Sequence, residues 1–407
     1  MTWVKKPRVN VFVDSQRVGS IDRSDVEEDT FLFDYEKDVE SRLAVSLTMP
    51  PRTDQYDSTS GLLPIFEMNL PEGGLKERLR NQFAKAVPGF DDLDMLAIVG
   101  SSQIGRLRYA HEEVIKEDVP AQDLKEILTY RGSEDFFAEL LERFATYSGI
   151  SGVQPKVLVR SQEHPMKFAH RGSTHIIKSF DSAEFPELAA NEVICTAGAL
   201  RAGLPTSKVT LSENRKLLIV DRFDRLSNGT YLGIEDFCVL TARRAHGRYD
   251  SSYEEIAKRI GDFVSPAKLG SAREQFALMV SYACAIENGD AHLKNFSVLY
   301  ENPDSSVSLA PAYDLVSTTP YFARDTLALT IAGSKNFPTR ASLLKFIRET
   351  TSKNEKAAAQ VIEQAVAGAE AARAEALVYA RRNPDASPFS EKLNACISRG
   401  ISRLTAD

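Results

Sequence analysis

The chain has 407 residues, which is enough for two or three domains with a sizeable core. Hydrophobic residues make up 43 % of it and charged residues 26 %, the proportions of an ordinary soluble globular protein. The formal net charge is −7 and there is no long basic run, which argues against a protein that binds nucleic acid by itself. Binding to DNA through a partner stays open.

Cysteine usage and the N-terminus indicate the compartment. Four isolated cysteines without a CxxC pair predict small buried side chains in a reducing environment rather than a zinc site. The N-terminus lacks an apolar run of signal-peptide length, and no segment reaches about 18 apolar residues. We therefore expect a cytoplasmic protein without a membrane span.

The first third of the chain predicts a β-rich unit. Between residues 8 and 50 apolar residues alternate in "RVNVFVD", "TFLFDY" and "LAVSLTM", which is typical of a small antiparallel sheet. Residues 51–61 are expected to form a loop, and a helical pattern follows Gly74. A short helix, a turn and a strand are expected at 91–110. The charged stretch at 112–123 predicts a soft boundary.

The rest of the chain changes from mixed to helical. β-branched strands are expected at "PKVLVR", "THIIKSF", "SKVTLS" and "KLLIVDRFDR", with a helix over 185–203. From about Ser251 the pattern is mostly helical, and 354–382 predicts an Ala-rich amphipathic helix. This order favours an α+β architecture over alternating βαβ units. We expect three units, at residues 1–112, 113–245 and 246–407.

The segment "NGDAHLKNF" (288–296) follows an apolar, helix-like run and is rich in groups that are costly to bury. Its Asp290 and Asn295 have the Asp-x4-Asn spacing of the protein-kinase catalytic loop, in which the Asp accepts the substrate proton and the Asn reaches Mg²⁺. One loop thereby fixes a base and a metal ligand in mutual register. Alone, the spacing is a weak signal.

Further kinase parts follow in kinase order along the chain. Asp314, after an apolar strand, is placed to hold Mg²⁺, and Lys178 lies on a strand like the lysine that grips ATP phosphates. Glu192 in the next helix could pair with that lysine. The Gly/Ser turn at 148–156 could aim N–H groups at phosphates. Together these parts predict that the polar groups of 288–296 meet Mg²⁺ and phosphate.

With these motifs in place, the sequence resembles the HipA serine/threonine kinases, the toxins of bacterial type II toxin–antitoxin modules. The resemblance spans roughly residues 8–335. It is carried by "VFVDSQRVGSI", "LAVSLTMP", "FEMNLPEGG", "SGVQPK", "THIIKSF", "FPELAANE", "VDRFDR", "EDFC", "NGDAHLKNFSVL", "LAPAYDL" and "ALTIAG". It implies a two-lobed, protein-kinase-like α+β fold with a β-rich N-terminal subdomain and an all-helical C-terminal lobe.

The resemblance also implies roles for individual residues. Asp290 would be the catalytic base, and Asn295 and Asp314 the Mg²⁺ ligands. The ATP site would be formed by the loop Ser151, Gly152, Val153, Gln154 and Lys156, by Lys178, by the adenine hinge Glu235, Asp236 and Phe237, and by His292, Lys294 and Tyr313. In the family a serine three residues before the loop glycine can be autophosphorylated. Here that offset falls on Gly149, so Ser148 and Ser151 become the candidates.

The implied partners are a HipB-like helix-turn-helix antitoxin, through which DNA would be reached indirectly, and a protein substrate such as an aminoacyl-tRNA synthetase. Three alternatives stay open. The catalytic loop is also similar to that of aminoglycoside and choline kinases, which are small-molecule phosphotransferases. A pseudokinase would bind nucleotide and partner without turnover, and a metal hydrolase would need more ligands than Asp290, His292 and Asp314.

Overall fold

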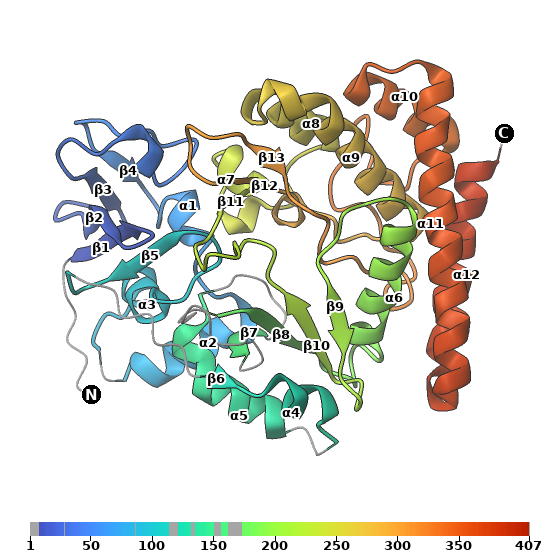
Figure 1. The fold of residues 1–407 in the computed structure, drawn as a ribbon, viewed down its shortest axis with the longest axis horizontal. Helices are drawn as coiled ribbons and strands as arrows, with labels where there is room; N and C mark the ends of the chain where they lie inside the picture. The colour runs from blue at the N-terminus through green and yellow to red at the C-terminus, as the bar shows by residue number, and fades with distance from the viewer. Residues whose placement is uncertain are drawn as a thin grey trace.

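The structure is a computed structural model that describes residues 8–27, 29–85, 87–113, 121–131, 135–149, 156–161 and 173–406. It combines three sheets with a helical lobe, which confirms the expected α+β, kinase-like class. Figure 1 shows the first sheet at one side of the molecule and the long helices α11 (Glu355–Arg382) and α12 (Ser387–Thr405) at the other. Within the described ranges, no helix is both long and apolar enough to span a bilayer.

The first sheet has five antiparallel strands in the order β4-β3-β2-β1-β5. They are β1 (Arg8–Val13), β2 (Gln16–Arg23), β3 (Phe31–Tyr35), β4 (Tyr56–Ser58) and β5 (Leu107–Ala110). Helices α1 (Pro64–Glu67), α2 (Gly73–Phe83) and α3 (Asp92–Val99) bury Phe66 and Leu79 in the same core as Val9 and Val11. The Asp91 side chain caps α3 by accepting from the N–H groups of Leu93 and Asp94.

The expected strand "LAVSLTM" does not form, and this prediction was wrong. Side chains from other segments form hydrogen bonds with its backbone groups instead. The Glu235 carboxylate accepts from Leu47 N at 2.8 Å, and Arg106 donates to Ala44 O at 2.6 Å. Because these groups are already bonded, they need no ladder partner. The fourth strand is β4, which lies inside the stretch 51–61 that was expected to be a loop.

The second sheet has the order β6-β7-β8-β10-β9 and carries the kinase-like lysines. Its strands are β6 (Ala121–Gln122), β7 (Lys156–Ser161), β8 (His175–Ser179), β9 (Val209–Leu211) and β10 (Leu217–Asp221). One face packs Val157 and Ile177 against α4 (Leu124–Thr129) and α5 (Asp135–Phe144). Strand alternation therefore directs Lys156 and Lys178 to the opposite face, where α6 (Leu188–Arg201) also packs.

The C-terminal lobe is mostly helical, but it is not all-helical as expected. β12 (Ser297–Tyr300) and β13 (Ser308–Leu309) lie within it and form a small antiparallel sheet with β11 (Gly233–Asp236). Its helices are α8 (Tyr253–Phe263), α9 (Pro266–Ala285), α10 (Arg340–Thr351), α11 and α12, and the short helix α7 (Phe237–Leu240) directly follows β11. The apolar run before the catalytic-loop motif is the buried end of α9, as the sequence predicts.

The Ala-rich helix α11 packs closely against α6. A Cβ on Gly198 of α6 would lie 2.6 Å from the Gly368 carbonyl oxygen, and a Cβ on Gly368 would lie 2.7 Å from the Gly198 carbonyl oxygen. Ala365, Ala369 and Ala372 of α11 are fully buried. Small side chains thus let the two backbones approach each other, which explains the composition of this helix.

Candidate active site

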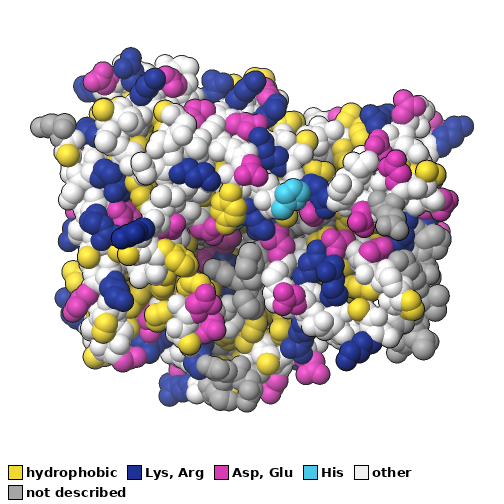
Figure 2. All heavy atoms as spheres, turned by 180° about the vertical axis from the view of Figure 1, so that it is seen from behind, with side chains coloured by type: hydrophobic (Ala, Val, Ile, Leu, Met, Phe, Trp, Pro, Cys, Tyr) yellow, Lys and Arg dark blue, Asp and Glu magenta, His cyan; other side chains and the backbone are white. Residues whose placement is uncertain are grey.

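A cavity of about 710 Å³ is lined by the second sheet, by α6 and by residues of the segment 289–325. The residues expected from the sequence that line it are Lys156, Lys178, Glu192, Asp236, Asp290, His292, Lys294, Asn295, Tyr313 and Asp314. Figure 2 shows one face hollowed near its centre, with Asp and Glu side chains inside and apolar side chains beside the hollow. This agrees with the mixture of carboxylates and apolar groups in the lining.

Two lysines lie side by side on the wall of the cavity that the second sheet forms. Lys156 of β7 is the direct cross-strand neighbour of Lys178 of β8, and both are buried. Burial lowers the pKa of Lys156, and the neighbouring charge of Lys178 adds to this, while Asp314 acts in the opposite direction. Like charges directly opposite each other destabilise a sheet. The pair is therefore suited to an anion that both ammonium groups can share.

The Lys178 ammonium already has two carboxylate partners. It donates to Glu192 Oε1 at 2.7 Å and to Oε2 at 3.0 Å, and it forms a short ion pair with Asp314 Oδ1. Burial alone would lower the pKa of Lys178, but Asp314 and Glu192 outweigh it and raise that pKa. Conversely the two lysines lower the pKa of Asp314 against the effect of its burial. Asp314 is held at φ +54°, an unusual value for a residue other than glycine.

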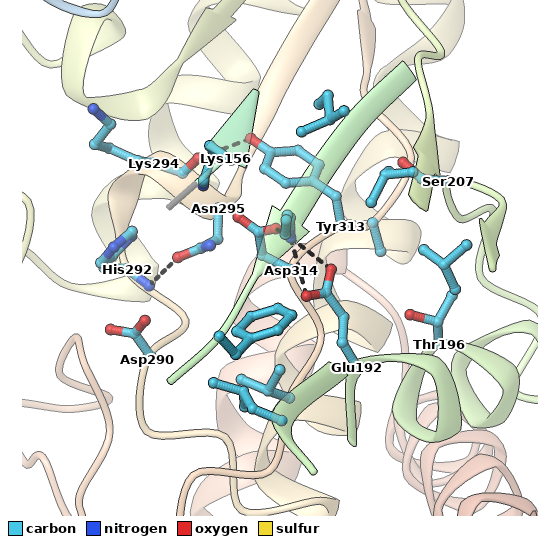
Figure 3. Close-up of a pocket in the computed structure, with 18 of the residues that line it drawn as sticks. Lys156, Glu192, Thr196, Ser207, Asp290, His292, Lys294, Asn295, Tyr313 and Asp314 are labelled. Carbon is cyan, nitrogen blue, oxygen red and sulfur yellow. Dashed lines mark hydrogen bonds and ion pairs between the residues drawn. The ribbon is translucent and has the colours of Figure 1, made fainter. Parts of the chain in front are cut away.

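The catalytic-loop motif is stabilised by its own amide side chains. Asn288 Oδ1 accepts from Asp290 N at 2.9 Å, and Asn295 Oδ1 accepts from His292 N at 3.0 Å. Asp290 lines the cavity beside His292, as Figure 3 shows. Burial raises the pKa of Asp290, although a hydrogen bond from Tyr249 counteracts part of the effect. A carboxylate with a raised pKa is better suited to accept a proton near neutral pH.

His292 and Lys294 belong to this loop, and Tyr313 contacts it from the segment before Asp314. Burial, together with the charges of Arg248 and Lys294, lowers the pKa of His292 to about 4, so its imidazole is neutral at pH 7. Tyr313 donates to the Lys294 carbonyl oxygen at 2.8 Å and thereby joins the segment before Asp314 to the loop.

Some expected residues lie elsewhere. The side chains of Glu235 and Phe237 do not line the cavity: Glu235 accepts from Ser46 Oγ at 2.6 Å, and Phe237 is fully buried in the core. Ser148 is fully buried, donating to Phe144 O at 2.6 Å and accepting from Leu158 N at 2.9 Å. Ser151, Gly152, Val153 and Gln154 lie outside the described residues.

Sequence reasoning missed a carboxylate that joins the N-terminal subdomain to the loop 288–296. Glu72 accepts from Arg248 at 2.7 Å and forms a short ion pair with Lys294. Although burial opposes the change, Lys294 and Arg248 lower the pKa of Glu72 to about 2. The motif "FEMNLPEGG" contained this residue, but only its family resemblance marked it, because its partners lie far along the chain.

Sequence reasoning also missed the buried glutamate that fixes the chain just before the loop 288–296. Glu287 is buried, has φ +54°, and accepts from Arg399 at 2.8 Å and from Arg403 at 3.0 Å, both on α12. Thr319 donates to the same carboxylate at 2.9 Å. The last described helix thereby fixes the residue that precedes Asn288.

The chain is similar to known proteins over most of its length. The family model described as HipA-like C-terminal domain matches residues 148–373, and the one described as HipA N-terminal domain matches residues 9–110. A curated relative from Sinorhizobium fredii (strain NBRC 101917 / NGR234), named "Putative kinase Y4mE", is 27 % identical over 304 residues, which is 70 % of each chain. A "Putative kinase" from Haemophilus influenzae is 30 % identical over 186 residues, 42 % of this chain and 53 % of that protein.

A solved structure shares the fold over nearly the whole chain. The chain superposes on one from the Shewanella oneidensis MR-1 toxin–antitoxin complex of HipA, HipB and operator DNA with a TM-score of 0.71. The match covers 98 % of this chain and 100 % of that chain at 18 % identity. At this identity the likeness supports the fold.

Proposed function

Because this chain belongs to the HipA family, we propose that it is an ATP- and Mg²⁺-dependent serine/threonine protein kinase and the toxin of a bacterial toxin–antitoxin pair. The observation that carries the kinase assignment is the buried Lys178, placed between Glu192 and Asp314 in the same cavity as Asp290. A strand lysine paired with a helix glutamate, together with a metal-binding aspartate, is the arrangement that protein kinases use for phosphoryl transfer.

The residues present fit ATP and Mg²⁺. Lys156 and Lys178 offer two adjacent ammonium groups for phosphate oxygens. Asp314 and Asn295 offer the carboxylate and amide oxygens that suit Mg²⁺. In the part of the chain that the structure describes, no cluster of three or more His, Cys, Asp or Glu side chains could hold an ion alone. Mg²⁺ bound through few protein ligands plus substrate phosphates needs no such cluster.

We place the adenine against an apolar wall. Met68 and Ile104 of the N-terminal subdomain pack with Phe223 and Ile234, and all four line the cavity. Asp236, at the end of β11, lies on the same cavity. We retain the loop of Ser151, Gly152, Val153 and Gln154 as the cover of the nucleotide, and the backbone around Glu235, Asp236 and Phe237 as the hinge.

In the reaction, bound MgATP supplies the transferable phosphoryl group and the cation that screens its charge. Lys156 and Lys178 orient the phosphates, and Glu192 keeps the Lys178 ammonium in place. Asp290 accepts the proton of the attacking hydroxyl group, for which burial has raised its pKa. His292, neutral at pH 7, adds no charge beside it.

The partner proposals follow the family. We propose a HipB-like helix-turn-helix antitoxin as the partner, DNA contact only through it, and an aminoacyl-tRNA synthetase in the cytoplasm as the substrate. The net charge of −7 is consistent with indirect DNA contact. For self-phosphorylation we favour Ser151, because Ser148 would first have to break two buried hydrogen bonds.

The test uses the purified chain with radiolabelled ATP, Mg²⁺ and a panel of purified synthetases, comparing wild type with Asp290→Asn. Loss of a general base lowers rates by roughly 10² to 10⁴. We expect that loss for labelled synthetase, and for the phosphorylated loop peptide in mass spectrometry, with ATP binding retained. Equal labelling by the variant would refute the kinase mechanism. Transfer only to small molecules would favour an aminoglycoside- or choline-kinase-like enzyme, and binding without transfer would favour a pseudokinase.

A further inference from the structure

Tyr249 has no part in the function proposed above, yet it contacts the proposed base directly. Its hydroxyl donates a hydrogen bond to Asp290 Oδ1 at 2.8 Å. The residue lines the active-site cavity and is 41 % exposed, and its partner Asp290 is exposed as well. It lies in the connection between the short helix Ala245–Gly247 and α8.

This contact is held from several sides. Leu293 N, inside the catalytic loop, donates to the Arg248 carbonyl oxygen at 3.2 Å, and the Arg248 guanidinium is fixed by Glu72. The Tyr249 ring lies edge-on to His292, with centroids 5.1 Å apart and an interplanar angle of 73°. The tyrosine hydroxyl is therefore positioned by the same loop that positions Asp290.

A phosphoryl acceptor needs the position that this hydroxyl occupies. A general base takes a proton from a hydroxyl group at a heavy-atom distance of about 2.6–3.2 Å. Tyr249 satisfies that distance at Oδ1, and its exposure shows that this side of Asp290 is the one that an acceptor can approach from solvent. An acceptor hydroxyl that arrives there has to compete with Tyr249 for the same oxygen atom.

We propose, on the basis of the kinase function above, that Tyr249 occupies the acceptor position in the substrate-free protein and is displaced when the acceptor hydroxyl binds. Tyr249 is then a positioning residue that marks the acceptor subsite beside Asp290. It also keeps water from this oxygen atom, so that ATP is not hydrolysed in the absence of an acceptor.

The test measures ADP release from saturating MgATP, with water as the only acceptor, by full-length wild type and Tyr249→Phe. The phenylalanine keeps the ring against His292 and removes only the hydroxyl. Since a hydrogen bond to a charged group corresponds to about tenfold or more in an equilibrium constant, we expect kcat to rise about tenfold with an unchanged KM for ATP. Tyr249→Leu should show the same rise, which guards against an effect specific to phenylalanine.

Tyr321→Phe is the matched control. Tyr321 also lines this cavity, but its hydroxyl donates to the Pro186 carbonyl oxygen at 3.1 Å, so removal of that hydroxyl should leave ADP release unchanged. Binding of a fluorescent ATP analogue and the thermal unfolding midpoint are measured for every variant. A purely structural role for Tyr249 could lower the rate or the midpoint but could not raise kcat at constant KM.

Each other outcome overturns the inference. If Tyr249→Phe binds the analogue as wild type does but releases ADP no faster, Tyr249 does not hold the acceptor position. If wild type carries phosphate on Tyr249 that disappears in Asp290→Asn, Tyr249 is itself an acceptor and not a placeholder. If wild type fails to bind the analogue, the kinase proposal fails and this inference fails with it.

Discussion

Replacement of Glu72 by glutamine tests how the N-terminal subdomain supports the catalytic loop. The partners Arg248 and Lys294 lower the pKa of Glu72 from 4.5 to about 2, even though burial acts in the opposite direction. At roughly 1.4 kcal/mol per pH unit, this gap corresponds to about 3 kcal/mol of folding free energy at pH 7. Because the folded-state pKa is depressed, the contribution is complete above about pH 5 and is lost as the pH falls toward 2.

The assay is urea unfolding of wild type and Glu72→Gln at pH 7 and at lower pH. The variant should be less stable by about 3 kcal/mol at pH 7, and the difference should shrink to about half near pH 3. Glu370→Gln, which removes one side of the exposed i,i+3 pair with Arg373, is the control and should cost less than about 0.5 kcal/mol. A pH-independent difference, or one no larger than that of the control, would show that the charge of Glu72 does not stabilise this contact.

Two further substitutions test other parts of the structure. Lys178→Ala leaves Glu192 and Asp314 without their shared cation. The affinity for an ATP analogue, measured by fluorescence titration, should fall at least tenfold. An affinity within twofold of wild type would contradict the phosphate-binding role of Lys178. Gly368→Ala places a Cβ 2.7 Å from the Gly198 carbonyl oxygen and should lower the free energy of unfolding in urea by about 1–3 kcal/mol. The control Gly270→Ala has open space around its Cβ and should be neutral or stabilising. Equal effects of the two substitutions would refute the close packing of α6 and α11.

Local patterns predicted the parts of the site that depend on neighbouring residues. Strand alternation gave β7 and β8, and with them the wall that holds Lys178. The expected pairing of Lys178 with Glu192 is observed, since a strand followed by a packed helix brings the two together. The spacing of Asp290 and Asn295 placed both in one loop at the cavity.

Contacts between distant segments could not be predicted in this way. Glu72 and Lys294 are 222 positions apart, and Tyr249 and Asp290 are 41 apart, so no helical or strand period connects them. The failed strand at "LAVSLTM" has the same origin. The alternation of this segment was suitable for a sheet. However, the backbone N–H of Leu47 donates instead to the Glu235 carboxylate of β11, which lies 188 positions further along the chain.

The anchoring of Glu287 by α12 has a consequence for the order of events during synthesis. Arg399 is added 112 residues after Glu287, and Arg403 is added 116 residues after it. At synthesis rates of roughly 5–20 residues per second, about 6–22 seconds pass between the addition of Glu287 and the addition of Arg399, its first guanidinium partner. A nascent chain released before α12 therefore lacks both guanidinium partners of the residue that precedes the loop 288–296. Limited proteolysis of such released chains should cut near residue 288 faster than it cuts the finished protein.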